Sequence, residues 1–291
     1  KGGKTSDVLM SQIDWMASLG ELIQAKFPKG SAIDSHSRLG NLLGTDDSHR
    51  PWAVPNLPWT MKQTWSNLLF AHYPIKFEVL RKLVPEALPL DSYNGMCWIG
   101  VVPFRMSGVR LRGLPPIPGT DQFPELNIRT YVTLDGKPGV YFFSLDAANW
   151  LAVKGAKTLY HLPYWYSDME IKNRGTNVEF ESKRQHDPEI ELACSYRPIS
   201  EPFQAAKGSF EEWMDERYCF YTLNSSGVPL RCDILHEPWI LQKAEAEFRH
   251  NSVLSKQGIA VESDLPILHF AKKIEVRAWP LVHHFTNRFS I

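Results

Sequence analysis

The clearest alternation of polar and apolar positions lies in residues 123–153. Glu125, Asn127 and Arg129 alternate there with apolar neighbours, and this period of two is typical of a β-strand. Residues 135–136, Asp-Gly, follow as a turn signal, because glycine takes positive φ and aspartate bonds the nearby backbone. A second β-rich run returns from this turn. The pattern therefore predicts a β-hairpin with an acid, an amide and a guanidinium on one face.

This polar face has two interpretations that the pattern alone leaves open. If the sheet closes over the face, the three groups converge in a cavity and have to satisfy one another or a ligand. If the face is solvated, Glu125 and Arg129 form a surface pair, which contributes about 0 to 1 kcal/mol to stability.

The first fifty residues differ in pattern from the rest of the chain. Apolar residues at spacings of three and four predict a helix over residues 7–27, which Pro28 and Gly30 end. Residues 30–59 have no period and end in a cluster of tryptophan and proline, as expected for a linker that becomes packed. We therefore expect an N-terminal helix and linker at residues 1–50 and a folded domain at 51–291.

The domain is predicted to be mainly β (α+β), with short strands and a few short helices. A helix is expected at residues 77–84, ended by Pro85, and another after the capping-box spacing of Ser209 and Glu212. Residues 154–157, Lys-Gly-Ala-Lys, are interpreted as a turn, and residues 238–248 have no clear pattern. Strands are predicted at residues 65–73, 96–104, 177–184, 189–196, 217–223 and 228–236, with 276–279 closing the sheet.

Composition excludes several classes of function. Lysine plus arginine and aspartate plus glutamate both number 32, so nothing in the charge favours nucleic acid or an anionic membrane. The four cysteines are far apart and form no C-x-x-C pair, and no apolar run is long enough for a membrane span. We expect a cytoplasmic protein with a small-molecule ligand, no nucleic-acid partner and no membrane partner. The N-terminal helix either packs on its own chain or forms a homo-oligomer contact.

The known catalytic motifs are also missing. No H-E-x-x-H, G-x-S-x-G, dinucleotide or P-loop pattern occurs, and the pair His283-His284 is interpreted as a solvated tail, so no metal and no cofactor are predicted. A set of polar and aromatic residues in β-rich surroundings remains. These candidates are Glu125, Asn127, Arg129, His161, Tyr164, Trp165, Arg217 and His236.

The candidate residues suggest acid/base chemistry. A carboxylate in a dry pocket has a raised pKa and works as a general acid or base, and an arginine beside it holds a carboxylate or an oxyanion. A buried Glu125–Arg129 pair that only fixes the sheet is the competing interpretation. Arg217 and His236 are open to the same objection, since either could cap a strand end or lie in solvent.

Several segments, taken in order, resemble one superfamily. Residues 80–91 are similar to the N-terminal signature of the acetoacetate-decarboxylase-like superfamily. Further segments resemble its uncharacterised YqjF-like branch, and the resemblance covers roughly residues 51 to 280. These segments are WIGVVPF at 98–104, ELNIRTYV at 125–132, GVYFFSLDA at 139–147, HLPY at 161–164 and ERY at 216–218.

The resemblance implies an antiparallel, closed, barrel-like β fold with a few short helices and an interior small-molecule pocket. Acetoacetate decarboxylases carry a Pro-Lys-Lys step in which one lysine forms a Schiff base with a β-keto acid. The corresponding step here is Pro163-Tyr164-Trp165, so the nucleophilic lysine is missing. Lys154 and Lys157 are the lysines close upstream. Glu125 matches an inward-facing acid of the family.

Three hypotheses follow. In the first, the protein is an enzyme that acts on a small carbonyl, enol or aromatic acid. Glu125 is then the general acid or base, Arg129 and Arg217 orient the negative group, and His161 and Tyr164 hydrogen-bond the ligand. The second is a non-catalytic protein that binds or sequesters a small hydrophobic or aromatic compound. The third is a scaffold whose polar face is structural.

Overall fold

The computed structural model describes residues 14–23, 49–116, 119 and 122–283. The chain divides into two compact units, Lys1–Val54 and Pro55–Ile291. In the first unit, α1 (Asp14–Leu22) lies within the predicted helix 7–27. The remainder of that prediction, residues 30–48 of the predicted linker and His284 of the predicted C-terminal tail lie outside the described residues.

The second unit is built mainly from strands, as the hydrophobic pattern predicts. Its helices in the described residues are short: α3 (Phe77–Arg81), α4 (Trp150–Tyr160), α5 (Phe210–Asp215) and a 3-10 turn at Ser255–Gln257. The strands are β1 (Met61–Ile75), β2 (Cys97–Leu111), β3 (Gln122–Leu134), β4 (Lys137–Ala147), β5 (Tyr164–Arg174), β6 (Asn177–Arg184), β7 (Glu191–Pro198), β8 (Cys219–Leu223), β9 (Pro229–Leu235), β10 (Leu241–Asn251) and β11 (Ile267–His283).

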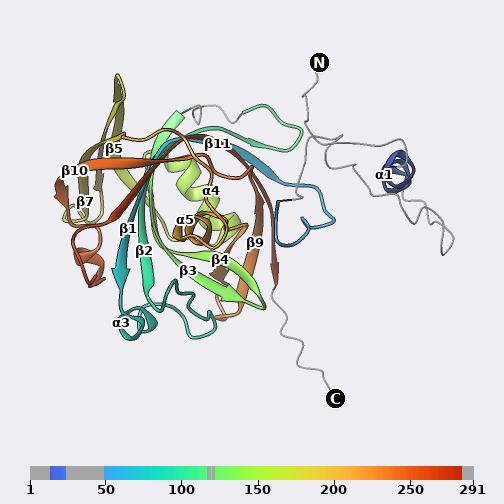
Figure 1. Ribbon diagram of the computed structural model, residues 1–291, viewed down its shortest axis with the longest axis horizontal. Coiled ribbons are helices and arrows are strands. Elements are labelled where there is room, and N and C mark those ends of the chain that lie inside the picture. Colours follow the sequence, from blue (N-terminus) through green and yellow to red (C-terminus); the bar gives the residue numbers. More distant parts are fainter. Residues whose placement is uncertain (1–13, 24–48, 117–118, 120–121, 284–291) are drawn as a thin grey trace. The chain divides into compact units, whose positions relative to one another are not determined.

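The sheet closes on itself, which confirms the predicted barrel-like architecture. Its strand order is β1-β2-β3-β4-β5-β6-β7-β10-β11-β9-β8, with the additional pairings β1–β11 and β4–β8. Strands β1, β2, β3, β4, β8, β9 and β11 therefore form a ring (Figure 1). The pairings are antiparallel, except that β4 runs parallel to both β5 and β8. The far C-terminal strand β11 closes the ring, as the sequence predicts.

The predicted hairpin is β3 and β4. Asp135 and Gly136 join the two strands with φ of 49° and 68°, the two positive values that a type I′ turn requires. The pairing register shifts between Ile128 and Arg129, so a β-bulge lies beside the polar face.

Helices α4 and α5 each pack a buried face against the interior of the ring. Val153 and Tyr160 of α4 and Met214 of α5 belong to the same buried cluster as Phe70 and Phe104 of the strands. Ser209 caps α5 by accepting a hydrogen bond from the Glu212 amide at 3.2 Å, which confirms the predicted start of the helix, while the Glu212 carboxylate accepts from the Gly208 amide rather than from Ser209. The helices therefore bring side chains to the interior of the barrel.

The structure corrects several local predictions. The helix expected over residues 77–84 ends at Arg81, and His283, interpreted as part of a tail, is the last residue of β11 and pairs with Leu230. Residues 154–157 are not a turn but part of α4, because Asn149 caps this helix by accepting from the Ala152 amide at 3.0 Å. Val153 and Tyr160, seven residues apart, then fall on one buried face. Strand β5 follows directly, in a segment that the sequence analysis did not assign to a strand. Among the described residues, no helix is long and apolar enough to cross a membrane.

Candidate functional site

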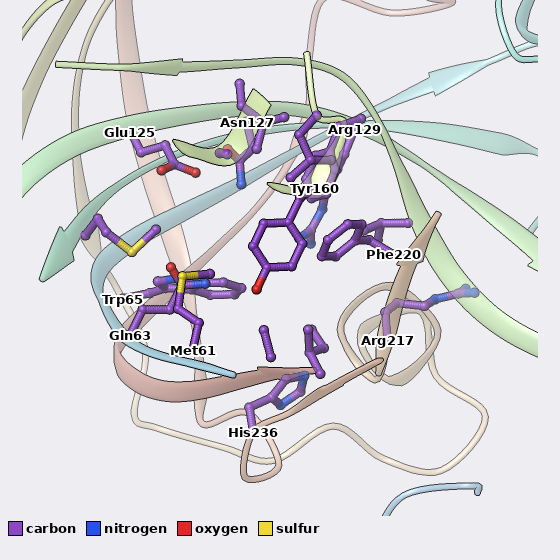
Figure 2. Close-up of a pocket in the computed structure, with 18 of the residues that line it drawn as sticks. Met61, Gln63, Trp65, Glu125, Asn127, Arg129, Tyr160, Arg217, Phe220 and His236 are labelled. Atoms are coloured by element: carbon purple, nitrogen blue, oxygen red, sulfur yellow. The ribbon is translucent and has the colours of Figure 1, made fainter. Parts of the chain in front are cut away.

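A cavity of about 90 Å³ lies inside the ring (Figure 2). Its wall combines aromatic and aliphatic side chains with a small number of polar groups from β3, α4, α5 and the strand ends, which is the usual composition of a ligand site. The polar lining residues are Gln63, Glu125, Asn127, Arg129, Tyr160, Tyr164, Asp215, Arg217 and His236, and the larger apolar ones are Met61, Trp65, Met106, Phe142, Phe220 and Trp239.

Glu125 lines this cavity and is buried from solvent. It is 2% exposed, and among the described residues its hydrogen-bond partner is the Tyr164 hydroxyl, which donates to Oε1 over 3.1 Å. Burial raises the pKa of Glu125 to about 8, and the Tyr164 hydrogen bond only partly opposes this by favouring the ionised form. Burial, together with the neighbouring Glu125, also raises the pKa of Tyr164 well above its usual value. A pKa of about 8 leaves Glu125 mostly protonated at neutral pH, with a minor ionised fraction.

Asn127 and Arg129 follow Glu125 along β3 and line the same cavity, so the polar face of the hairpin points inward (Figure 2). Both residues are buried, and neither Asn127 Oδ1 nor Arg129 Nε has a hydrogen-bond partner among the described residues. The guanidinium lies over the rings of Phe70 and Tyr131, 5.4 and 5.7 Å from their centroids. A buried guanidinium without a carboxylate partner is suited to binding an anionic oxygen.

Arg129 belongs to a buried hydrogen-bond network with Tyr131 and His72. Its Nη2 donates to the Tyr131 hydroxyl over 3.5 Å, and this hydroxyl also bonds His72 Nε2. Burial lowers the pKa of His72 well below its usual value, and the Arg129 charge lowers it further, so His72 is neutral. If Tyr131 accepts from Arg129, its own proton goes to His72 Nε2. The network thus orients the guanidinium without neutralising its charge.

Asp215 is a second carboxyl in the cavity wall, and the sequence analysis did not identify it. It is the last residue of α5 and 3% exposed, and neither of its oxygens has a hydrogen-bond partner among the described residues. Burial raises the pKa of Asp215 well above its usual value, and the nearby Glu216 raises it too, while Arg129 acts in the opposite direction. The cavity therefore holds two carboxyls that favour the protonated form.

Arg217 lines the cavity but is engaged elsewhere. Its Nη1 donates to Asp91 Oδ2 and its Nε to the Trp213 carbonyl, both over 2.6 Å. The guanidinium stacks over the rings of Trp213 and Tyr131. Figure 2 shows the side chain extending away from Tyr160 and His236. Asp91 neutralises this guanidinium, so its ability to hold a ligand is smaller than that of Arg129.

His236 and Tyr160 complete the polar lining. The ring of His236 stacks on Tyr218 with 4.6 Å between centroids, and its Nδ1 donates to the Glu237 carbonyl over 2.8 Å. The Tyr160 hydroxyl lies 3.1 Å from Thr60 Oγ1 and points into the cavity (Figure 2). Tyr160 was missed because the sequence analysis did not predict α4.

Two predicted site residues lie outside the cavity wall. His161 is exposed and ends α4 in the left-handed conformation, with φ of 50°. Trp165 is exposed on the other face of β5 from Tyr164, between Lys157 and Arg184 at 5.0 and 4.8 Å from its ring centroid. The structure therefore brings Tyr164, but neither His161 nor Trp165, to Glu125. Strand alternation explains the separation of Tyr164 from Trp165.

No lysine is among the described residues that line the cavity. Lys154 and Lys157 are exposed on α4, and Lys157 packs against the outward-facing Trp165. In the part of the chain that the structure describes, no group of three or more His, Cys, Asp or Glu side chains could hold a metal ion.

Comparisons with known proteins agree with this architecture. The family DUF2071, described as an uncharacterized conserved protein, matches residues 62–275. The uncharacterized protein YqjF of Bacillus subtilis (strain 168) is 50% identical over 229 residues, which are 79% of this chain and 94% of that protein.

Solved structures share the fold at low sequence identity. The acetoacetate decarboxylase of Legionella pneumophila is 11% identical, with a TM-score of 0.54 over 82% of this chain and 94% of its own. The enduracididine biosynthesis enzyme MppR, solved in complex with pyruvate, is 8% identical, with a TM-score of 0.54 over 81% of this chain and 96% of its own. These similarities show an acetoacetate-decarboxylase-like fold.

Proposed function

The chain belongs to the DUF2071 family of uncharacterised conserved proteins, and we propose that it is an enzyme that uses acid/base chemistry on a small carbonyl, enol or aromatic acid inside its barrel. The observation that carries this proposal is the environment of Glu125. Glu125 faces a cavity and has a pKa of about 8, so both its protonated and its ionised forms are populated close to neutral pH. This is the condition under which a general acid or base works best at neutral pH.

Each polar group has a distinct part in the proposed chemistry. Glu125 gives a proton to the ligand or takes one from it, and Tyr164 holds the carboxyl in place through its hydroxyl. Arg129 binds the negative oxygen of the ligand, because it lines the cavity and its Nε has no hydrogen-bond partner among the described residues. The apolar wall excludes water and strengthens these interactions.

Amine catalysis is not part of the proposal. The step that resembles the Pro-Lys-Lys of acetoacetate decarboxylases reads Pro163-Tyr164-Trp165 and holds no lysine, and Tyr164 donates a hydrogen bond to Glu125. Lys154 and Lys157 are exposed on α4 and do not line the cavity. A Schiff base with the ligand would need a lysine nitrogen within reach of the ligand, so proton transfer is the chemistry that the lining supports.

Non-catalytic binding or sequestration of a small hydrophobic or aromatic compound is the second candidate. The aromatic wall favours it, since Trp65, Phe142, Phe220 and Trp239 all line the cavity. In this case the protein binds its ligand, but Glu125 transfers no proton.

Solvent deuterium exchange tests the proposal without knowledge of the natural substrate. Pyruvate and phenylpyruvate in D₂O exchange the hydrogens next to the carbonyl when a base removes them, and proton NMR follows the loss of signal. We expect the protein to accelerate exchange of at least one probe. Glu125→Gln should lower the rate by roughly 100-fold or more and leave the dissociation constant of the probe nearly unchanged.

A matched variant separates the cavity from the surface. Glu170→Gln removes an exposed glutamate on β5 and should leave the exchange rate unchanged. Exchange that survives Glu125→Gln would contradict the proposal. Saturable binding of a probe with no accelerated exchange would favour sequestration instead.

A further inference from the structure

Asp215 has the surroundings of a ligand-binding group and lacks those of a structural one. It lies at the end of a six-residue helix that is already fixed by other contacts. The Phe210 and Trp213 rings of α5 pack 4.5 Å from Trp98 and 4.6 Å from Tyr131, measured between centroids. Asp215 adds no hydrogen bond to the described residues from either side-chain oxygen.

The neighbouring arginine could have neutralised Asp215 but does not. Arg217 is two residues away and forms its ion pair with Asp91 over 2.6 Å. Arg129 is close enough to influence the charge of Asp215, yet the structure shows no ion pair between them within the described residues. A buried carboxyl without a partner costs free energy, and such groups are concentrated at functional sites.

We propose that Asp215 is a second catalytic carboxyl, which exchanges a proton with the oxygen of an enolisable carbonyl ligand while Glu125 exchanges one with the adjacent carbon. The inference rests on the proposed function of Glu125 and narrows it to a 1,3-proton shift, the interconversion of a ketone and an enol or of two isomers through an enol. Both carboxyls line one cavity, and they come from different elements, β3 and α5.

The step balances without an external reactant. The Glu125 carboxylate takes the proton from the carbon next to the carbonyl, and the electron pair of that C–H bond forms the new C=C bond. The π electrons of the C=O bond move to oxygen, which takes the proton of the Asp215 carboxylic acid. Glu125 ends protonated and Asp215 ionised, so the number of protons on the protein is unchanged. The reverse step, from either face of the enol, restores both groups.

The position of Arg129 explains why Asp215, rather than Glu125, serves the oxygen. The Arg129 charge acts on Asp215, and Arg129 lines the same cavity. The oxygen of an enolising ketone gains negative charge during the reaction, and a guanidinium stabilises that charge. The same guanidinium stabilises the Asp215 carboxylate once its proton has left. Glu125 has Tyr164 beside it instead of a cation.

The test combines two variants of Asp215 in the pyruvate exchange assay. Asp215→Asn keeps the shape of the side chain and removes the transferable proton. We expect it to lower the maximal rate of exchange by at least about ten-fold and to change the dissociation constant of pyruvate little. Asp215→Ala opens space beside Arg129, and added formate should restore part of its rate in a saturable manner. Formate should not accelerate Asp215→Asn, whose amide still fills the space.

The outcomes distinguish this inference from the function it rests on. If Glu125→Gln abolishes exchange while Asp215→Asn exchanges like the unmodified protein, Glu125 keeps its role and the inference about Asp215 is wrong. If the unmodified protein accelerates no exchange, both are wrong. A reduced maximal rate in Asp215→Asn with an unchanged thermal midpoint, together with formate rescue of Asp215→Ala, supports the proton-transfer role over a structural one.

Discussion

The two faces of the β3–β4 hairpin each hold a buried carboxyl, but the two carboxyls differ in the number and charge of their hydrogen-bond donors. Glu125 on the inner face and Asp146 on the outer face are each 2% exposed. Asp146 receives hydrogen bonds from Arg184 Nε and Nη2 and from Ser167 Oγ, at 2.8, 2.7 and 2.7 Å. Glu125 receives one, from Tyr164 at 3.1 Å. The pairing of Leu126 with Asp146 and of Glu125 with Ala147 puts these two acids on opposite faces.

This difference shows that burial by itself does not identify a functional acid. Asp146 is equally buried, but a bidentate guanidinium and a hydroxyl compensate for the lost hydration of its charge. Glu125 and Asp215 lack that compensation and have raised pKa values. The number and charge of the hydrogen-bond partners therefore separate the structural acid from the candidate catalytic ones.

The largest expected effect comes from breaking the outer pair. Arg184→Ala leaves the Asp146 carboxylate buried without its cation and should lower the free energy of unfolding by about 3 to 5 kcal/mol. Urea denaturation measures this change. Arg174→Ala is the control, since Arg174 pairs with Glu179 on the exposed part of the β5–β6 hairpin. Equal effects of the two variants would contradict the structural role of Asp146 and Arg184.

On the inner face, removing the ionisable carboxyl of Glu125 should raise the free energy of unfolding instead of lowering it. Between pH 4.5 and about 8 the folded protein holds a proton on Glu125 that the unfolded chain has released, so Glu125 makes the free energy of unfolding fall as pH rises through this window. Each pH unit counts about 1.4 kcal/mol. Glu125→Gln removes this dependence and should be more stable than the unmodified protein by about 3 kcal/mol at pH 7.

Denaturation curves of both proteins at pH 5, 6, 7 and 8 provide the measurement. The difference between the two proteins should widen from pH 5 to pH 8 and then stay constant. A Glu125→Gln variant that is less stable than the unmodified protein throughout this range would indicate an ionised, well-paired glutamate, like Asp146.

The smallest effect concerns the partner of Glu125. Tyr164→Phe removes the hydrogen bond that favours the ionised form of Glu125, so the pKa of this carboxyl should rise further above 8. The loss of one buried hydrogen bond should cost about 1 kcal/mol of stability. The pH dependence of deuterium exchange gives the shift, because the limb that belongs to Glu125 should move to higher pH. A limb that stays in place would show that Tyr164 does not act on this carboxyl.

The inner face of the hairpin was predictable because it depends on local pattern. Strict alternation put Glu125, Asn127 and Arg129 on one side of β3, and Asp-Gly fixed the turn. The acetoacetate-decarboxylase-like resemblance then decided between a solvated face and a cavity. The closure of the sheet by β11 was also predicted, from a β-rich run near the C-terminus.

The remaining parts of the candidate site depend on contacts that are distant in sequence. In the sequence, Asp215 is one of several acids in a short helix. Only the folded structure shows that it is buried and that its side-chain oxygens have no hydrogen-bond partner among the described residues. Tyr160 reaches the cavity because it lies on α4, which Asn149 caps. The Lys-Gly-Ala-Lys stretch within α4 has the sequence of a turn, so the helix was not predicted. Conversely, His161 and Trp165 were predicted from their proximity in sequence to Tyr164, but the end of α4 and the alternation of β5 turn them outward.

The central claim is that Glu125 carries a proton at neutral pH when no ligand is added, and a direct titration tests it. Carbon NMR of protein labelled at the glutamate side-chain carboxyl, with Glu125→Gln to assign the signal, follows this one group across the pH range. The account predicts a midpoint at about 8, well above the ordinary glutamate value of 4.5. A midpoint at or below 4.5 would show that burial does not raise the pKa of Glu125, and would contradict the observation from which its acid/base role is inferred.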